Sequence, residues 1–201
     1  SEDRPGACAR ERMLLAPAIA RLGRDFDGRV GIAVRKRGCV WTVGHAPNRL
    51  MPQQSVSKLW VAMAALNAVD RGRLSLDRRV ALSRDDFVVF NQPLRALVLQ
   101  RGRVVLKVRD LITHSLIHSD NLANDRLLRL VGGPEAVRAM LRRKGLEGIG
   151  FGPGERLLQS STAGLVWRPS YAAGNNFDRA RARLPMATRR AALRRYLDDP
   201  A

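Results

Sequence analysis

Apolar residues recur at the spacing of one helix face in several stretches of the chain, and each stretch predicts a helix. These stretches are residues 9–22, 55–71, 106–117, 121–131 and 185–197. Pro17 lies inside the first stretch and predicts a kink or a restart there. Gly72 predicts the end of the second helix, and Pro134, after two glycines, predicts the start of a further one.

Residues 29–34 and 39–43 are rich in residues that favour strands, and Arg37-Gly38 separates them, which predicts a hairpin. A two-stranded hairpin is marginal by itself and needs further strands or a helix packed against it. Residues 74–80 are expected to form a short connection, and residues 151–154 a glycine-rich break before a loop. The expected architecture is a helical block with one hairpin beside it.

The chain has 201 residues, of which 45% are hydrophobic, and this is enough for one folded domain. No apolar run approaches the roughly 18 residues that a membrane-spanning helix needs, so no membrane partner is expected. The first five residues are polar and charged. The protein is therefore either cytosolic, or it is exported and the sequence begins after a cleaved leader.

The formal net charge is +18, which would attract nucleic acids, anionic lipids or acidic polymers. Only four of the 36 basic residues are lysine, and the arginines are dispersed in runs no longer than two. A dedicated nucleic-acid-binding arm would concentrate its charge. We therefore expect no nucleic-acid partner.

Two cysteines and three histidines give no pattern typical of a metal site. Cys8 and Cys39 form no Cys-x-x-Cys pair, and His114 and His118 have no third ligand near them in the sequence. We interpret the histidines as ordinary helix residues and expect no metal or cofactor. The cysteines are either two separate thiols or one disulfide, which an exported protein could form.

Ser55 and Lys58 lie three residues apart at the start of a strongly apolar helix, so their side chains share one helix face. A serine hydroxyl needs a neighbouring base to become a nucleophile. A lysine in an apolar setting is favoured in its neutral form, which can accept the serine proton. The alternative is a serine cap with a solvated lysine, but the apolar run 59–66 favours a buried one.

Ser119, Asp120 and Asn121 form a second polar group between two expected helices. Alone, these residue types are typical of a helix cap, and Asp120 or Asn121 can cap the helix that follows. Taken in order, however, Ser-x-x-Lys followed by Ser-Asp-Asn resembles the class A β-lactamases and penicillin-binding proteins. The stretches LNAVDRGRLSL (66–76) and NLANDRLLRLVGG (121–133) are similar to that family as well.

The resemblance covers at least residues 28–145 and implies roles for particular residues. Ser55 would be the acylated nucleophile and Lys58 its activating partner. Ser119 would pass a proton to the leaving nitrogen, and Asn121 would contact the substrate.

Class A enzymes also carry a glutamate that polarises the deacylating water, followed four positions later by an asparagine. Counting from Gly145 gives Glu155 for the glutamate, and Gln159 stands where the asparagine is expected. Gln159 keeps the amide but is one methylene longer. The alternative for Glu155 is an exposed loop carboxylate beside Arg156, in which case the enzyme would acylate and then stall.

The family's third motif, Lys-Thr/Ser-Gly on a strand that forms one cleft wall, does not occur in the 201 residues. We therefore expect a chain that is truncated or incomplete relative to the family, inactive by itself. The alternative is a genuinely short protein that has lost catalysis, and the presence of Ser55, Lys58 and Ser119 argues against it. A missing C-terminal segment or a swapped chain would complete the sheet.

We accordingly predict an α/β (α+β) β-lactamase/transpeptidase-like fold, reduced mainly to its all-α lobe plus an N-terminal hairpin. Residues 1–201 would form one such domain, with residues 1–50 from its α/β part and residues 51–201 from its helical lobe. The predicted function is serine acyl transfer on β-lactams or related, peptidoglycan-like amides, in the periplasm or outside the cell. Alternatives are a D-alanyl peptidase or esterase on the same fold, and a non-catalytic module that binds an acidic envelope polymer.

Overall fold

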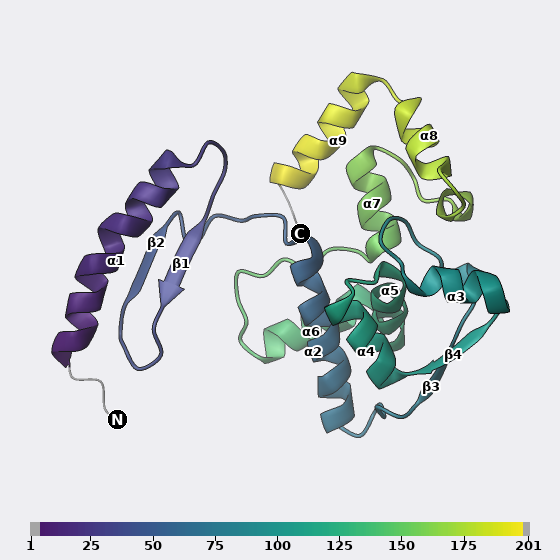
Figure 1. The fold of residues 1–201 in the computed structure, drawn as a ribbon, viewed down its shortest axis with the longest axis horizontal. Coiled ribbons are helices and arrows are strands. Elements are labelled where there is room, and N and C mark those ends of the chain that lie inside the picture. The colour runs from purple at the N-terminus through teal and green to yellow at the C-terminus, as the bar shows by residue number, and fades with distance from the viewer. Residues whose placement is uncertain (1–4, 199–201) are drawn as a thin grey trace. The chain divides into compact units, whose positions relative to one another are not determined.

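The computed structural model describes residues 5–198, and the chain divides into two compact units, Ser1–Met51 and Pro52–Ala201 (Figure 1). Each unit has its own hydrophobic core. None of the helices described between residues 5 and 198 is long and apolar enough to cross a membrane.

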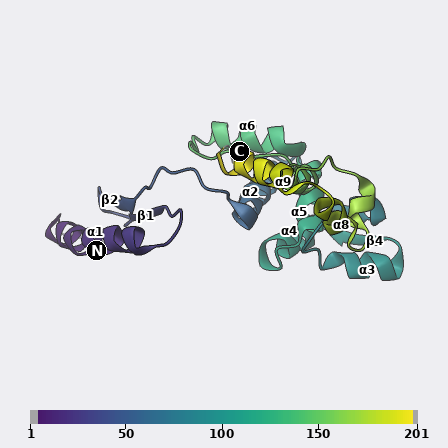
Figure 2. The same cartoon turned by 90° about the horizontal axis from the view of Figure 1, so that it is seen from above.

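The first unit consists of one helix packed on one hairpin. The helix α1 (Pro5–Asp25) lies along the antiparallel pair of β1 (Ile32–Arg35) and β2 (Thr42–His45) in both views (Figures 1 and 2). The expected hairpin is present, with strands that begin about three residues later than predicted. The helix continues through its internal proline instead of restarting there.

A small apolar core joins the helix to the hairpin. Ile19 of α1 is buried with Trp41 and Val43. Cys8 and Cys39 form a disulfide, which ties the start of α1 to the turn before β2. The two cysteines are therefore not separate thiols, and the covalent link compensates for the small size of this core.

The second unit is mainly helical and has a short second hairpin. Its elements, in order, are η1 (Gln54–Val56), α2 (Ser57–Asp70), β3 (Arg79–Leu82), η2 (Arg84–Asp86), α3 (Leu94–Arg101), β4 (Val104–Lys107), α4 (Val108–Ile117), α5 (Asn121–Leu130), α6 (Gly133–Arg143), α7 (Glu155–Ala163), η3 (Pro169–Ala172), α8 (Asn176–Ala182) and α9 (Met186–Asp198).

The helix α2 is apolar on nearly every side, as expected for a buried helix, and α4, α5 and α6 all pack against it. Its Val61 and Ala65 are fully buried, together with Leu111 of α4 and with Leu122 and Leu127 of α5. The apolar run that follows Lys58 therefore forms the central helix of this core.

The pairing of β3 with β4 was not predicted, since residues 79–80 were expected in a connection and residues 106–107 in a helix. The strands pair antiparallel, with Val80 opposite Leu106 and Leu82 opposite Val104. Each strand has only four residues, so its alternation of buried and exposed positions is too short to stand out from the flanking helix pattern.

Candidate active site

Ser55 lies in η1, a short 3₁₀ helix that runs directly into α2. Ser55 is therefore one turn before Lys58. The Nζ of Lys58 donates a hydrogen bond to Oγ of Ser55 at 3.1 Å. Gln54, just before the serine, has a φ of 50°, a left-handed conformation that costs a non-glycine residue about 1–2 kcal/mol. Such strain is concentrated at functional sites, where the surrounding structure maintains it.

Lys58 is almost completely buried, with 2% of its surface exposed. Its Nζ also lies 3.4 Å from Oε1 of Glu155, so the ammonium group bridges the serine hydroxyl and a buried carboxylate. An unpaired buried charge would be strongly unfavourable, and the carboxylate offsets that penalty. The expectation of a buried rather than a solvated lysine is confirmed.

Ser119 reaches the same hydroxyl from the other side, because its Oγ donates to Oγ of Ser55 at 2.8 Å. Its backbone has a φ of 51°, again in the left-handed region. Asn91 stabilises this turn, since its side-chain amide donates to the carbonyls of His118 and Ser119 at 2.8 and 3.0 Å.

Asp120 and Asn121 fix the position of the turn relative to its neighbours. Asp120 is fully buried, and its carboxylate accepts from the backbone N–H of Ala123, as a cap of α5, and of Leu94 in α3. The side chain of Asn121 donates to the carbonyl of Val89 at 3.1 Å. Of the two predicted caps, Asp120 is the one that caps α5.

Glu155 begins the helix α7 instead of lying in a loop, and 7% of its surface is exposed. The prediction of a loop after the glycine-rich break was wrong. Residues 155–163 include several good helix formers, and the acidic first residue suits the positive end of the helix dipole. Gln159 lies one turn later, and its Nε2 donates to Oε2 of Glu155 at 3.1 Å. The alternative of an exposed loop carboxylate is therefore wrong.

The residues with a predicted catalytic or substrate-binding role all line one cavity of about 350 Å³, namely Ser55, Lys58, Ser119, Asn121, Glu155 and Gln159. Its lining consists of Gln54, Ser55, Lys58, Phe90, Asn91, Ser119, Asn121, Glu155, Leu158, Gln159, Thr162 and Tyr196. Phe90, Asn91 and Tyr196 were not predicted, because no local pattern links them to the two motifs. Burial, and secondly the charge of Glu155, raise the pKa of the Tyr196 hydroxyl.

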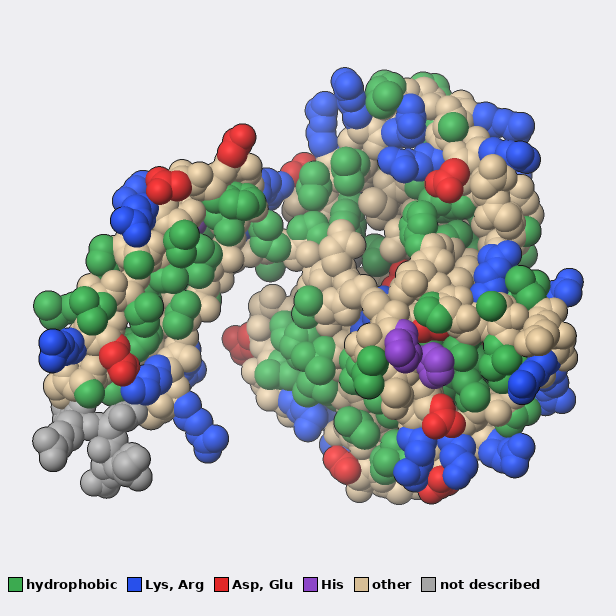
Figure 3. Space-filling view, in the orientation of Figure 1, with side chains coloured by type: hydrophobic (Ala, Val, Ile, Leu, Met, Phe, Trp, Pro, Cys, Tyr) green, Lys and Arg blue, Asp and Glu red, His purple; other side chains and the backbone are tan. Residues whose placement is uncertain are grey.

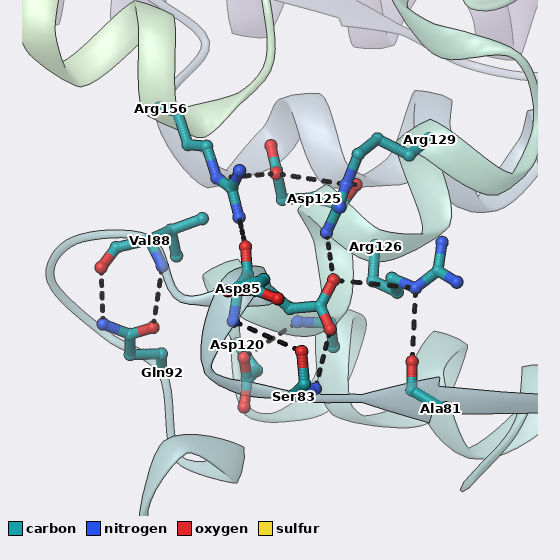
Figure 4. Close-up of polar contacts among 12 residues, drawn as sticks. Ala81, Ser83, Asp85, Val88, Gln92, Asp120, Asp125, Arg126, Arg129 and Arg156 are labelled. Atoms are coloured by element: carbon teal, nitrogen blue, oxygen red, sulfur yellow. Dashed lines mark hydrogen bonds and ion pairs between the residues drawn. The ribbon is translucent and has the colours of Figure 1, made fainter. Parts of the chain in front are cut away.

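A network of ion pairs holds the start of α7 against α5 and the η2 turn (Figure 4). Arg156 donates to the backbone carbonyl of Asp85, and its Nε lies 3.6 Å from Oδ2 of Asp125. Arg129 contacts the same Asp125 oxygen at 3.7 Å and donates to Asp86 at 2.6 Å. Arg156 thus anchors the segment that carries the neighbouring Glu155, while Arg129 joins α5 to the η2 turn.

Asp125 is the acidic centre of this network. Its pKa is raised because desolvation outweighs the nearby Arg129 and Arg156. Gly154 packs directly on this carboxylate, and a Cβ at that position would lie 2.7 Å from Oδ1. The glycine therefore allows the backbone before Glu155 to approach α5 closely.

The fold and the cavity at Ser55 place the chain in the class of proteins with a β-lactamase/transpeptidase-like fold. The solved β-lactamase of Chitinophaga pinensis superposes with a TM-score of 0.65 at 25% identity, covering 90% of this chain and 67% of that one. An ancestral class A β-lactamase superposes with a TM-score of 0.64 at 26% identity, covering 89% and 68%. The predicted fold class is confirmed.

The family model described as "Beta-lactamase enzyme family" matches residues 14–182, and the chain belongs to this family. It is 35% identical over 101 residues to the extended-spectrum β-lactamase PER-1 of Pseudomonas aeruginosa, covering 50% of this chain and 33% of that protein. It is 30% identical over 131 residues to a β-lactamase of Rhodobacter capsulatus, covering 65% and 43%. The chain thus spans less than half the length of these two curated relatives.

Proposed function

We propose that the protein is a serine acyl-transfer enzyme that acts on β-lactams or related amides through a covalent intermediate on Ser55. One observation carries the proposal, namely the convergence of two donors on the Ser55 hydroxyl. Ser119 lies 2.8 Å and Lys58 3.1 Å from its Oγ, and Lys58 also contacts Glu155. A nucleophile, its base and a group that orients the base are the parts that covalent catalysis requires.

In the acylation step, Ser55 Oγ attacks the substrate carbonyl while its proton passes to neutral Lys58. Glu155 can receive the extra proton of Lys58 beforehand, since the two groups are in contact. Ser119 donates a proton to the nitrogen as the amide bond breaks. Lys58 then passes to Ser119 the proton that it took from Ser55. Asn121, on the cavity wall, binds the substrate.

Before deacylation, Glu155 returns its proton to Lys58 through their contact and is again a carboxylate. In the deacylation step it acts as general base and removes a proton from the water that attacks the acyl-enzyme. The bond between the acyl carbon and Ser55 Oγ then breaks, and Oγ takes up a proton to restore the serine. Gln159 supports this role because it holds one carboxylate oxygen of Glu155, at 3.1 Å. General-base assistance of this kind is worth about 10²–10⁴-fold in rate. Without it, the protein would behave as a penicillin-binding protein or peptidase with a long-lived adduct.

An oxyanion hole is built from backbone or side-chain donors aimed at the developing charge, and we propose that the backbone N–H of Ser55 is one of them. We propose that a strand with a Lys-Thr/Ser-Gly triplet supplies the second donor and the opposite wall. The cavity that the 201 residues form by themselves would then hold the nucleophile without full catalytic power. Loss of one donor costs about 10²–10³-fold in rate.

We also propose a location outside the cytoplasm, in the periplasm or the medium. The Cys8–Cys39 disulfide supports this location, because such bonds persist mainly in oxidising compartments.

Chemical labelling tests the nucleophile without requiring turnover. The purified chain is incubated with an activated phosphonate ester and, separately, with benzylpenicillin, and peptide mapping by mass spectrometry locates the adduct. We expect labelling at Ser55 that is lost in Ser55→Ala and kept in Ser57→Ala, a matched control two residues away. Labelling elsewhere, or none by either reagent, would favour the alternative of a non-catalytic binding module.

A further inference from the structure

A second cavity of about 310 Å³ adjoins the one that contains Ser55. Phe90, Gln159 and Thr162 line both cavities, so the two lie side by side. Its remaining walls come from α7, α8 and α9. Gln159 also donates a hydrogen bond to Glu155, so the second cavity lies next to the proposed deacylation site.

Part of the second cavity is apolar and partly aromatic. Phe177 of α8 is buried, with 4% of its surface exposed, and meets the ring of Phe90 edge to face at 5.3 Å. Ala163 and Leu193 add aliphatic surface from α7 and α9. A hydrocarbon chain or ring of a ligand would be desolvated here.

The other part is cationic. Arg181, Arg189 and Arg190 line it, and no acidic residue is among its lining. Within the part of the chain that the structure describes, no hydrogen bond or ion pair joins these three guanidinium groups to another residue. The Nε of Arg189 is moreover buried without an acceptor, which is unfavourable for a charged donor unless a ligand supplies one.

The backbone adds to this positive potential. Met186, the first residue of α9, lines the cavity, so the positive end of the helix dipole adjoins it. The first turn of α9 contains no acidic side chain. Basic side chains also predominate on the outer surface over α8 and α9 (Figure 3).

We propose that this cavity binds the acyl side of the substrate, and that the acyl group it selects carries a carboxylate on an apolar chain or ring. The apolar wall would cover the chain, and the forked guanidinium groups would bind the carboxylate. The inference rests on the proposed function of Ser55, because the second cavity shares the lining residues Phe90, Gln159 and Thr162 with the cavity that contains Ser55. It adds the substrate class, which the serine site alone does not define.

Equilibrium binding tests this cavity independently of any reaction. The chain is titrated with 3-phenylpropionate and with the neutral 3-phenylpropanamide, and the Nε–Hε signal of Arg189 is followed by NMR. We expect saturable binding of the acid, with a Kd at least about 10-fold below that of the amide, as charge-assisted hydrogen bonds imply. Arg189→Gln should remove most of this preference.

Arg194→Gln is the matched control, since Arg194 lies on the same helix, is exposed and does not line the cavity. It removes the same charge, and we expect it to change the Kd less than about twofold, as for an exposed, screened charge. Equal affinity for acid and amide, or equal effects of the two substitutions, would overturn the proposal. Arg181→Gln, at an exposed position, provides a second variant if Arg189→Gln unfolds.

A pair of penicillins connects the cavity to catalysis. One carries a glutaryl and the other a pentanoyl group on the same nucleus, so that they differ only in a terminal carboxylate against a methyl. We expect Ser55 to be acylated about 10-fold faster by the glutaryl compound, a ratio near one in Arg189→Gln and an unchanged ratio in Arg194→Gln. Absence of any adduct would refute the proposed function, while the NMR titration would still decide the binding site.

Discussion

The Nζ of Lys58 lies 3.4 Å from Oε1 of Glu155, and only 3% and 8% of the two side chains are exposed. Removal of one partner leaves the other charge buried and uncompensated, which typically costs about 3–5 kcal/mol. We therefore expect Lys58→Met to lower the free energy of unfolding by about this amount. The double variant Lys58→Met/Glu155→Gln should recover most of the loss, because neither charge is then buried alone.

Urea unfolding of the two single variants, the double variant and the parent chain completes the cycle. Lys107→Met is the control, since its ion pair with Asp77 is exposed, at 52% and 60%, and such pairs contribute less than about 1 kcal/mol. A coupling energy near zero between Lys58 and Glu155 would show that the buried pair does not stabilise the fold.

Glu155 should govern deacylation more than acylation. Its Oε2 accepts a hydrogen bond from Gln159 and its Oε1 one from Lys58. A neutral amide in its place has no basic oxygen and could not remove a proton from water. We expect Glu155→Gln to lengthen the lifetime of the Ser55 adduct by about 10²–10⁴-fold while adduct formation changes far less. Mass spectrometry of the intact protein after removal of excess penicillin measures this lifetime. Equal decay in the variant and the parent chain would reject the assignment.

The pairing of Ser55 with Lys58 was predictable because a three-residue spacing on a helix brings two side chains together without knowledge of the rest of the fold. The contact between Ser55 and Ser119 spans 64 positions, and only the order of the two motifs along the chain indicated this contact. Glu155 followed from a count along the family pattern, and its helix was missed because the flanking glycines predicted a loop.

The missed parts of the site depend on tertiary structure alone. Asn91 holds the turn of Ser119 from 28 positions away, and Tyr196 reaches the cavity from α9. Neither belongs to a motif or to a periodic run of chemically similar residues. The short strands β3 and β4 were missed for a related reason, since four residues of alternation carry too little signal.

Gly154→Ala should disturb the start of α7, because the new Cβ would lie 2.7 Å from Oδ1 of Asp125, closer than side chains tolerate. We expect a loss of about 1–3 kcal/mol in the free energy of unfolding, as for overpacked interiors. Faster adduct formation is not expected, but deacylation should slow because Glu155 is the next residue. Gly6→Ala is the control, since among the described residues its added Cβ meets no atom within 4 Å apart from its chain neighbours and its own helix backbone. Unchanged stability and adduct lifetime in Gly154→Ala would contradict this account.

The buried carboxyl of Asp125 should make stability depend on pH in an unusual direction. Desolvation raises its pKa above the ordinary value of 3.8, in spite of Arg129 and Arg156. Between the two values the folded chain holds a proton that the unfolded chain has lost, so this group's contribution falls as pH rises. Glu135 has the opposite sign, because hydrogen bonds from Arg142 and Arg138 lower its pKa from 4.5.

Asp125→Asn removes the titration while keeping the size of the side chain and an oxygen that can accept hydrogen bonds. We expect the stability of this variant relative to the parent chain to increase as pH rises from about 3.8. Glu135→Gln should show the reverse, with its relative stability decreasing as pH rises through the lowered pKa of Glu135 toward 4.5. Urea unfolding of the three proteins at half-unit steps between pH 3 and 7 measures both slopes. A flat difference for Asp125→Asn would mean that the arginines fully compensate the buried charge, and the raised pKa would then be wrong.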